Sequence, residues 1–205
     1  MKRCQVEGCT NKHYGHGYCE KHYKQIKRCG KILDRTTRTP NEIIEYEDYA
    51  EMLLYNNKNE VIASTKIDLD DIDKINKYKW CIQTGRGYSY IMNSKLGQLH
   101  RFLMNCPSDM QVDHINHDTF DNRKENLRIC TLQENSWNSK IQTNNSSGYT
   151  GVKQKGDNWE AQIIINKRTI KLGVFSTKEE AIEARKYAEI EHYGDYAPEN
   201  NNEVK

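Results

Sequence analysis

An acidic residue and a histidine stand side by side in the stretch VDHINHDTFDNRKENLRICTLQENSWN, residues 112–138. The carboxylate of Asp113 and the amide oxygen of Asn135 suit a hard divalent cation that keeps several of its waters. The imidazole of His114 can take a proton from water near neutral pH. The stretch therefore predicts a site that combines a bound cation with a base, if the fold brings these three residues together.

The pattern around these residues predicts such a fold. Residues 112–115 have strand character, a polar loop follows, and residues 126–130 alternate as a second strand. A T-x-x-E capping box that begins at Thr131 predicts a helix to about residue 139. Asn135 lies on that helix, so the order strand, loop, strand and helix is expected to assemble the site.

Three cysteines and a histidine near the N-terminus form a second candidate site, with the spacing C-x4-C-x9-C-x2-H. Three thiolates and an imidazole can close a tetrahedron around zinc, and a segment this short depends on metal for its fold. Two alternatives are that His16 replaces His22 as the fourth ligand, or that the thiols are reduced and bind no metal. His13 and Cys29 are spare candidates. The favoured ligands are Cys4, Cys9, Cys19 and His22.

Composition restricts the class of protein. The chain has 205 residues, of which 36% are hydrophobic and 29% charged, so it can hold one medium domain or a few small ones. No run reaches the roughly 18 to 20 apolar residues of a membrane span, and the first residues lack the apolar stretch of a signal peptide. We therefore expect a soluble, cytoplasmic protein whose seven cysteines form a metal site and a few buried thiols rather than disulfides.

Charge is distributed unevenly along the chain, although the formal net charge is only +2. Residues 1–40 carry +7, whereas residues 41–80 carry −5. Clusters of Lys and Arg bind nucleic acid by releasing counterions from the phosphate backbone, so the basic N-terminal segment is expected to contact DNA. The alternative is a basic face that is merely solvated. The candidate contacts lie on one predicted helix: Lys21, Lys24, Lys27 and Arg28.

The C-terminal third predicts a small sheet followed by a helix. Alternation places Trp159 and Ala161 on one face of a strand, and Glu160 and Gln162 on the other. Residues 149–171 carry +3, whereas the rest of the chain beyond them is acidic. The sheet rather than the helix is therefore expected to face DNA.

The stretch from 112 to 138 closely resembles the HNH endonucleases, in particular phage and intron-borne homing enzymes with the ββα-metal fold. The resemblance implies that His114 is the general base, that Asp113 and Asn135 hold the catalytic metal ion, and that Asn126 holds the loop and orients His114. The metal would polarise the scissile phosphate and assist the leaving 3′ oxygen. Asn135 stands where many members have a histidine, which favours Mg²⁺ or Mn²⁺.

The resemblance extends over roughly residues 46–140 and includes the LHR element at 99–101. It implies that Arg101 contacts phosphate; the alternative is that His100 and Arg101 support the fold. A rival function is a non-catalytic DNA-binding regulator that uses the C-terminal sheet, and another is an RNA-directed nuclease. Binding alone needs none of the catalytic set, which favours a nuclease.

Two further resemblances concern the ends of the chain. GYCEKHY resembles small zinc knuckles found ahead of phage nuclease domains. YTGV, WEAQI, LGVF and the terminal YGDYA resemble the Apetala-type DNA-binding domain of plant ethylene-response factors. Thr150 and Lys153 stand where arginine is common, so the target sequence cannot be carried over. The alternative is a small structural domain that docks on the nuclease. Family positions that touch DNA correspond to Thr150, Lys153, Lys155, Gln162, Thr169 and Lys171.

Together these patterns predict an α+β protein built from modules. They are a zinc knuckle with a basic helix at 1–33, an HNH nuclease core at 46–140, a three-stranded antiparallel sheet plus helix at 148–197, and a tail at 198–205. The predicted activity is metal-dependent, site-preferring cleavage of double-stranded DNA, with Mg²⁺ or Mn²⁺ for catalysis and Zn²⁺ for structure. No membrane or small-molecule substrate is expected, and the predicted setting is a bacterial host cell carrying a phage or mobile element.

Overall fold

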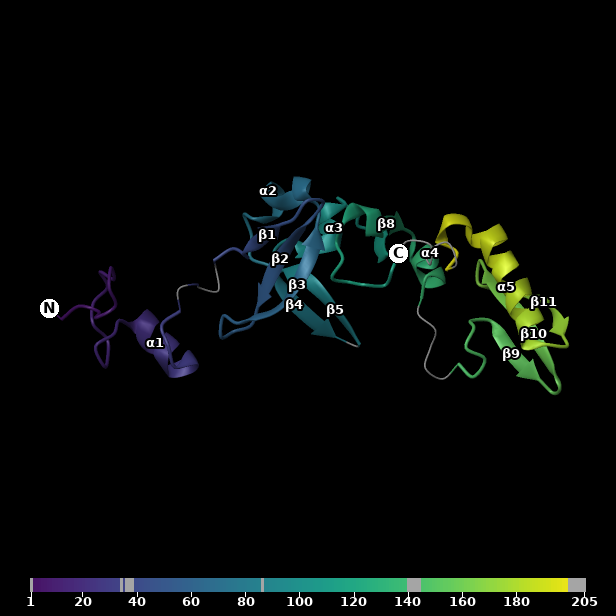
Figure 1. The fold of residues 1–205 in the computed structure, drawn as a ribbon, viewed down its shortest axis with the longest axis horizontal. Helices are drawn as coiled ribbons and strands as arrows, with labels where there is room; N and C mark the ends of the chain where they lie inside the picture. The colour runs from purple at the N-terminus through teal and green to yellow at the C-terminus, as the bar shows by residue number, and fades with distance from the viewer. Residues whose placement is uncertain (1, 34, 36–38, 86, 140–144, 199–205) are drawn as a thin grey trace. The chain divides into compact units, whose positions relative to one another are not determined.

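The computed structural model describes residues 2–33, 35, 39–85, 87–139 and 145–198 (Figure 1). Helices and short antiparallel sheets are both present, which confirms the predicted α+β class. The chain divides into two compact units, Met1–Leu99 and His100–Lys205. The division falls inside the predicted 46–140 domain, so residues 100–140 share a unit with the C-terminal sheet.

The first unit begins with a short loop region and one helix, α1 (Glu20–Cys29). The loops are held by isolated bridges, Arg3 with Lys12 and Gly15 with Tyr18. α1 ends at Gly30, whose positive φ of 71° allows its N–H to reach the carbonyl of Ile26. The four predicted metal ligands lie within this region.

Two antiparallel sheets form the rest of the first unit. β2 alternates between fully buried residues, Ala50, Met52 and Leu54, and half-buried ones, as a strand with one face on the core does. Trp80 is also buried, and its Nε1 donates to the carbonyl of Ile75 at 3.1 Å. The elements are β1 (Ile43–Glu45), β2 (Ala50–Tyr55), β3 (Val61–Ile67), η1 (Leu69–Asp71), α2 (Ile72–Ile75), β4 (Cys81–Gly85), β5 (Tyr88–Asn93) and β6 (Gly97–Gln98).

A strand, loop, strand and helix follow in the second unit, in the predicted order. β7 pairs with β8 in antiparallel register, so that Asp113 lies opposite Arg128. The helix after them is α4, which packs on both strands. The elements are α3 (Leu99–Leu103), β7 (Gln111–His114), η2 (Lys124–Asn126), β8 (Leu127–Cys130) and α4 (Leu132–Trp137).

A three-stranded antiparallel sheet, ordered β11-β10-β9, and one long helix complete this unit. Ala161 and Ile163 face the helix and are fully buried, as the alternation predicts. Thr177 caps the helix through a capping box with Glu180. The elements are β9 (Val152–Lys155), β10 (Asn158–Ile165), β11 (Arg168–Phe175), α5 (Lys178–Tyr193) and η3 (Gly194–Tyr196).

The C-terminal sheet and helix share a hydrophobic cluster with α4. Trp137 of α4 packs against it, and its ring stacks on Tyr193 with 4.3 Å between centroids and 10° between planes. A contact of this kind joins the β7-β8-α4 segment to the C-terminal module by apolar burial. The buried members of the cluster are Ile163, Ala188, Tyr193 and Ala197.

None of the helices in the described ranges is long and apolar enough to cross a membrane. The predicted tail lies outside the described residues except for Pro198. The division into two compact units does not test the boundaries of the predicted modules, which remain predictions.

Candidate active site and metal centre

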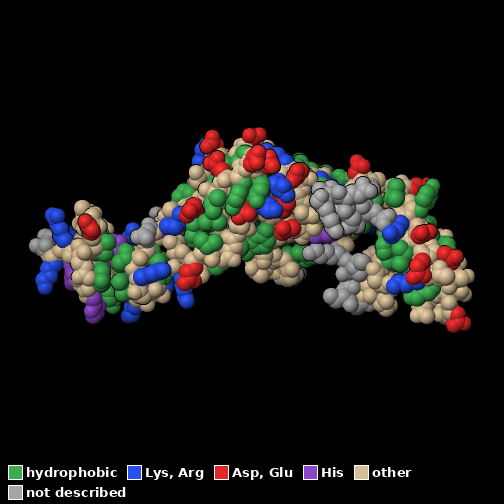
Figure 2. Space-filling view, in the orientation of Figure 1, with side chains coloured by type: hydrophobic (Ala, Val, Ile, Leu, Met, Phe, Trp, Pro, Cys, Tyr) green, Lys and Arg blue, Asp and Glu red, His purple; other side chains and the backbone are tan. Residues whose placement is uncertain are grey.

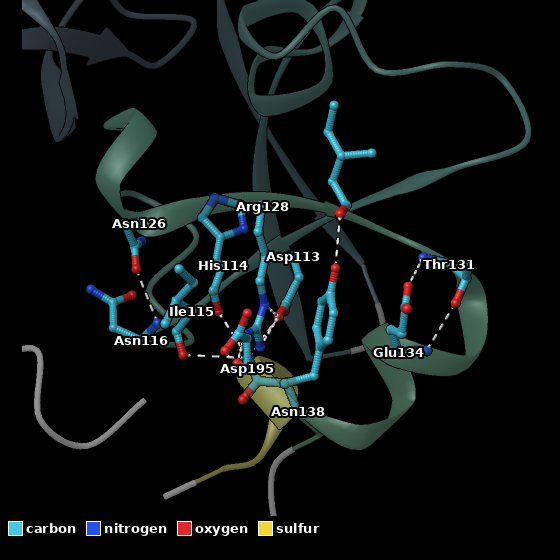
Figure 3. A network of polar contacts seen from close by, with 12 residues as sticks. Asp113, His114, Ile115, Asn116, Asn126, Arg128, Thr131, Glu134, Asn138 and Asp195 are labelled. Carbon is cyan, nitrogen blue, oxygen red and sulfur yellow. Dashed lines mark hydrogen bonds and ion pairs between the residues drawn. The ribbon is translucent and has the colours of Figure 1, made fainter. Parts of the chain in front are cut away.

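Asp113 lies on β7 with its carboxylate nearly buried and held from two directions (Figure 3). Nε and Nη2 of Arg128 donate to its Oδ2 at 2.9 and 2.7 Å. Nδ2 of Asn138 donates to the same oxygen at 2.9 Å. Within the described part of the chain no hydrogen bond reaches Oδ1 of Asp113. One oxygen is therefore fixed, and the other remains available to a cation.

His114 follows on the same strand and is also buried. Its Nε2 lies 3.3 Å from Oδ1 of Asn122, whose Nδ2 donates to the carbonyl of Thr119 at 3.2 Å. That bond directs Oδ1 of Asn122 at the ring, so the hydrogen-bond network assigns the proton of His114 to Nε2. Burial lowers the pKa of His114, against the opposing effect of the Asn122 hydrogen bond. The ring is therefore neutral near pH 7 and able to accept a proton.

The two residues of the LHR element have structural contacts here. The His100 ring lies edge-on to His114 with 5.0 Å between centroids, and burial followed by the charge of His114 lowers the pKa of His100 to about 3. Nη1 and Nη2 of Arg101 donate to the carbonyls of Met110 and Pro107 at 2.7 and 2.8 Å. Arg101 therefore holds the turn before β7, and its predicted contact with phosphate remains a prediction.

Asn126 ties together the loop between β7 and β8. Its Oδ1 accepts from the backbone N–H of Asn116 at 3.0 Å, and its Nδ2 donates to the carbonyl of Asp121 at 2.9 Å. Its own carbonyl accepts from the N–H of Ile115 at 2.9 Å. These bonds fix the chain directly after His114, as a residue that holds the loop requires. A part in catalysis remains a prediction.

The capping box predicted for α4 is present. The N–H of Thr131 donates to Oε2 of Glu134 at 2.7 Å, and the N–H of Glu134 donates to Oγ1 of Thr131 at 3.2 Å (Figure 3). Two donors at the helix start are satisfied in this way. The box fixes where α4 begins and thus which of its residues face β7.

Asn138, the residue that ends α4, makes the contact between the helix and β7. Besides binding Asp113, its Nδ2 lies 3.3 Å from the carbonyls of His114 and of Ile115. Asn135 is half-buried on the same helix, and its side chain makes no hydrogen bond to another described residue. The structure thus joins Asn138 to Asp113, and the role of Asn135 as a metal ligand remains a prediction.

Sequence reasoning missed Asn122 and Arg128. A signal existed for Arg128, because the paired strands place it opposite Asp113, and opposite charges are favourable at such positions. No comparable signal marks Asn122, since its contact with His114 depends on the path of an irregular loop.

The four predicted N-terminal ligands come together in space. All their ligand atoms lie within 4.8 Å of one another. Nδ1 of His22 is 3.2 Å from Sγ of Cys4 and 3.5 Å from Sγ of Cys19, and Sγ of Cys9 is 3.9 Å from that of Cys19. Such separations suit four donors at the usual 2.0 to 2.3 Å around one zinc ion. The cluster is a possible metal site, and its donor set fits zinc.

The two other histidines considered as zinc ligands, His13 and His16, make contacts outside the cluster. Nε2 of His13 accepts from the N–H of Gly17 at 3.0 Å, and the ring of His16 stacks on Tyr23 with 5.6 Å between centroids. His22 rather than His16 therefore completes the cluster. Burial opposes ionisation of Cys4, but hydrogen bonds, chiefly with His22, lower its pKa to about 6. A thiolate is the form that binds metal.

The predicted DNA contacts on α1 all lie at the surface. Lys21, Lys24, Lys27 and Arg28 are exposed, and Lys24 also pairs with Glu20 at 2.6 Å. Lys and Arg side chains, blue in Figure 2, project from this N-terminal region. The helix can therefore present positive charge to a polyanion, although contact with DNA remains a prediction.

The C-terminal sheet and the turn just before it carry the other predicted contacts. Glu160 lies between Lys153 and Lys155, whose Nζ atoms are 3.0 and 2.9 Å from its carboxylate oxygens. These two lysines lower the pKa of Glu160 to about 2. Thr150, Thr169 and Lys171 are exposed and Gln162 is half-buried. Glu160 therefore neutralises part of the charge of Lys153 and Lys155 directly, a pairing that a count of charge along the segment does not locate.

Comparison with known proteins agrees with the geometry. A family model described as HNH endonuclease matches residues 105–137, which hold β7, β8 and α4. An uncharacterized HNH endonuclease of Acanthamoeba polyphaga mimivirus is 32% identical over 141 residues, which cover 65% of this chain and 73% of that protein. No solved structure gives a significant match. On the strength of this relative and of the matched segment that carries Asp113 and His114, the chain belongs to the HNH endonucleases.

Proposed function

We propose that this endonuclease uses a divalent metal ion to hydrolyse phosphodiester bonds of double-stranded DNA at preferred sites. The observation that carries the proposal is the pair on β7. A neutral, buried His114 stands next to Asp113, which has one oxygen fixed and one open. A base and a cation ligand side by side are what hydrolysis of a phosphodiester needs.

His114 is the general base of this proposal. Its Nδ1 accepts a proton from the water that attacks phosphorus, while Asn122 holds the ring through Nε2. Asn126 keeps the loop after His114 in place through three hydrogen bonds. Because the ring is already held in place, little orientational entropy is lost when it takes part in the reaction.

Asp113 and Asn135 hold the catalytic ion in the proposal. Their oxygen donors fit Mg²⁺ or Mn²⁺ better than a softer metal. A divalent cation bound there would offset the charge that develops on the phosphate and on the leaving 3′ oxygen. At the N-terminus, the cluster of thiols and imidazole is assigned to structural zinc.

DNA affinity comes from two places in this proposal. The basic residues of α1 and the sheet face with Lys155 and Lys171 contact phosphates, and Gln162 reads a base, because an amide can pair with adenine in the major groove. Site preference then arises in the C-terminal module, as in the Apetala-type domains that it resembles. The viral source of the relative supports a mobile genetic element as the setting.

The test is cleavage of supercoiled plasmid in buffer freed of divalent ions by a chelating resin, with Mg²⁺, Mn²⁺ or no addition, followed by mapping of the ends. Asp113→Asn is expected to abolish cleavage. Asp73→Asn, which removes an exposed carboxylate of α2, is the matched control and should cleave like wild type. Cleavage without added metal, or by Asp113→Asn at the wild-type rate, would contradict the proposal.

A further inference from the structure

The short helix η3 at the end of α5 lies against the strand that carries Arg128, although 67 positions separate the two in sequence. Nη1 of Arg128 donates to the carbonyl of Asp195 at 2.7 Å (Figure 3). The guanidinium carbon of Arg128 also lies 4.5 Å from the centre of the Tyr196 ring. The C-terminal module therefore contacts the residue that holds Asp113.

Tyr196 is itself anchored to the nuclease segment. Its hydroxyl donates to the carbonyl of Ile129 at 3.2 Å, next to Arg128 on β8. Its ring lies 6.4 Å from that of Trp137, which stacks on Tyr193. An aromatic group from the C-terminal module thus covers β8 from the side on which Arg128 lies.

Arg128 connects these contacts to the site. Its guanidinium is planar and donates in fixed directions, so a carbonyl on one nitrogen and a ring on its face determine where the other nitrogens point. Nε and Nη2 point at Oδ2 of Asp113. The side chain of Arg128 is only 15% exposed and that of Asp113 8%. Solvent therefore screens this ion pair less than it would screen a surface pair.

We propose that Tyr196 and the backbone of Asp195 are positioning elements of the nuclease site. They hold Arg128 so that it fixes Oδ2 of Asp113 and leaves Oδ1 directed at the divalent ion, and the site is complete only when the C-terminal module is docked. The inference rests on the proposed function in one respect, the assignment of Asp113 as a metal ligand. It makes the DNA-reading module a part of the machinery that prepares cleavage.

The test measures Mn²⁺ binding to the intact, zinc-loaded chain through the electron paramagnetic resonance signal of free Mn²⁺. Tyr196→Ala removes the ring over Arg128 and is expected to weaken Mn²⁺ binding by about 10- to 100-fold, the range typical for loss of an outer partner of a ligand. Tyr196→Phe keeps the ring and should stay within a few-fold of wild type. Tyr187→Ala, which removes a tyrosine of α5 that is 71% exposed, is the matched control.

A second variant covers the case in which Tyr196→Ala does not fold. Arg128→Lys keeps the positive charge but cannot reach Asp113 and Asp195 with a planar fork, so it should also weaken Mn²⁺ binding. For all variants, DNA binding without Mn²⁺ is expected to be unchanged, which a general loss of structure would not permit.

The outcomes separate the two proposals. Wild-type Mn²⁺ affinity in folded Tyr196→Ala and Arg128→Lys overturns the positioning role, even if Asp113→Asn has lost the ion. Wild-type Mn²⁺ affinity in Asp113→Asn overturns the assignment of Asp113 as a ligand and thus the proposed function. Weakened binding in Asp113→Asn, Tyr196→Ala and Arg128→Lys, but not in Tyr187→Ala, supports both.

Discussion

His114 owes its chemistry to its neighbours rather than to its residue type alone. A solvated histidine would be partly protonated at pH 6.5, whereas burial on β7 lowers the pKa of His114 and keeps the ring neutral. The contact with Asn122 assigns the proton of the ring to Nε2. The basic nitrogen is thereby prepared before any substrate arrives.

His114→Ala should therefore lower cleavage by about 10²- to 10⁴-fold, the usual cost of losing a general base, and leave DNA binding nearly intact. The measurement is plasmid cleavage together with binding in the absence of divalent ions. His117→Asn is the matched control, because His117 has a left-handed φ of 62° that asparagine also adopts. Equal cleavage by His114→Ala and the control would rule out His114 as the base.

Residue types and spacing predicted part of this site and left another part hidden. Asp113, His114 and the N-terminal ligands stand in compact patterns whose chemistry can be inferred before folding. Asn122 could not be found, because its contact depends on an irregular loop. Arg128 could be inferred only as a partner of Asp113 across the strands, and its contact with Asp195 arises from tertiary packing alone.

At the scale of elements, local signals predicted the structure well. The strands β7 and β8 and the capping box of α4 follow from alternation and from Thr-x-x-Glu spacing, and alternation also predicts the sheet that precedes α5. The buried pair of Arg185 with Glu189 on α5 did not follow, since a charge pair at that spacing is normally solvated. Burial of that pair comes from the sheet that α5 covers.

The N-terminal element should depend on its metal. Cys19→Ser is expected to reduce the bound zinc from about one ion per chain to nearly none and to unfold the segment before β1, because structural zinc supplies the folding energy of so small a region. Metal analysis and amide hydrogen exchange check both effects. Cys29→Ser is the matched control, since Cys29 lies outside the cluster. A folded, zinc-free Cys19→Ser protein would contradict the assignment.

The C-terminal sheet should lose stability in acid through Glu160. The pKa of Glu160 falls from 4.5 to about 2 in the folded protein, so its contribution to stability is present above pH 4.5 and disappears as the pH falls toward 2. At pH 6 the wild type should therefore have a higher melting temperature than Glu160→Gln. The difference between the two melting temperatures should shrink between pH 4.5 and 2. Tryptophan fluorescence follows the melting.

The matched control for this experiment is Glu183→Gln, which removes an exposed carboxylate of α5. Its melting temperature should differ little from wild type at any pH in the series. A difference between wild type and Glu160→Gln that stays constant from pH 6 to 2 would mean that the lysines do not hold Glu160 in its charged form.

For the whole molecule, function depends on which unit holds the basic, catalytic and DNA-reading residues, and on which modules share a hydrophobic cluster. The basic segment with α1 belongs to the unit Met1–Leu99, whereas the catalytic residues and the C-terminal sheet belong to His100–Lys205. The predicted modules at 46–140 and 148–197 share the cluster around Trp137 and Tyr193, so the alternative of a structural domain that docks on the nuclease and the proposal of a DNA reader are compatible. Sequence patterns could not reveal this sharing, because the contacts join residues far apart in the chain.

DNA affinity should divide between the two units in a way that salt can measure. Removing a side chain that neutralises one phosphate should reduce the slope of log affinity against log salt by about 0.9. Replacing the four basic residues of α1 by alanine is therefore expected to flatten the slope strongly without altering the preferred site. The joint change Lys155→Ala and Lys171→Ala should flatten it less, whereas Gln162→Ala should relax base preference at an unchanged slope. Competition binding on a randomised DNA pool across a salt series measures both the salt slope and the base preference. Lys178→Ala on α5, outside the proposed DNA face, is the control. If the α1 variant keeps the wild-type slope, its basic face is merely solvated, and the C-terminal sheet must supply the affinity.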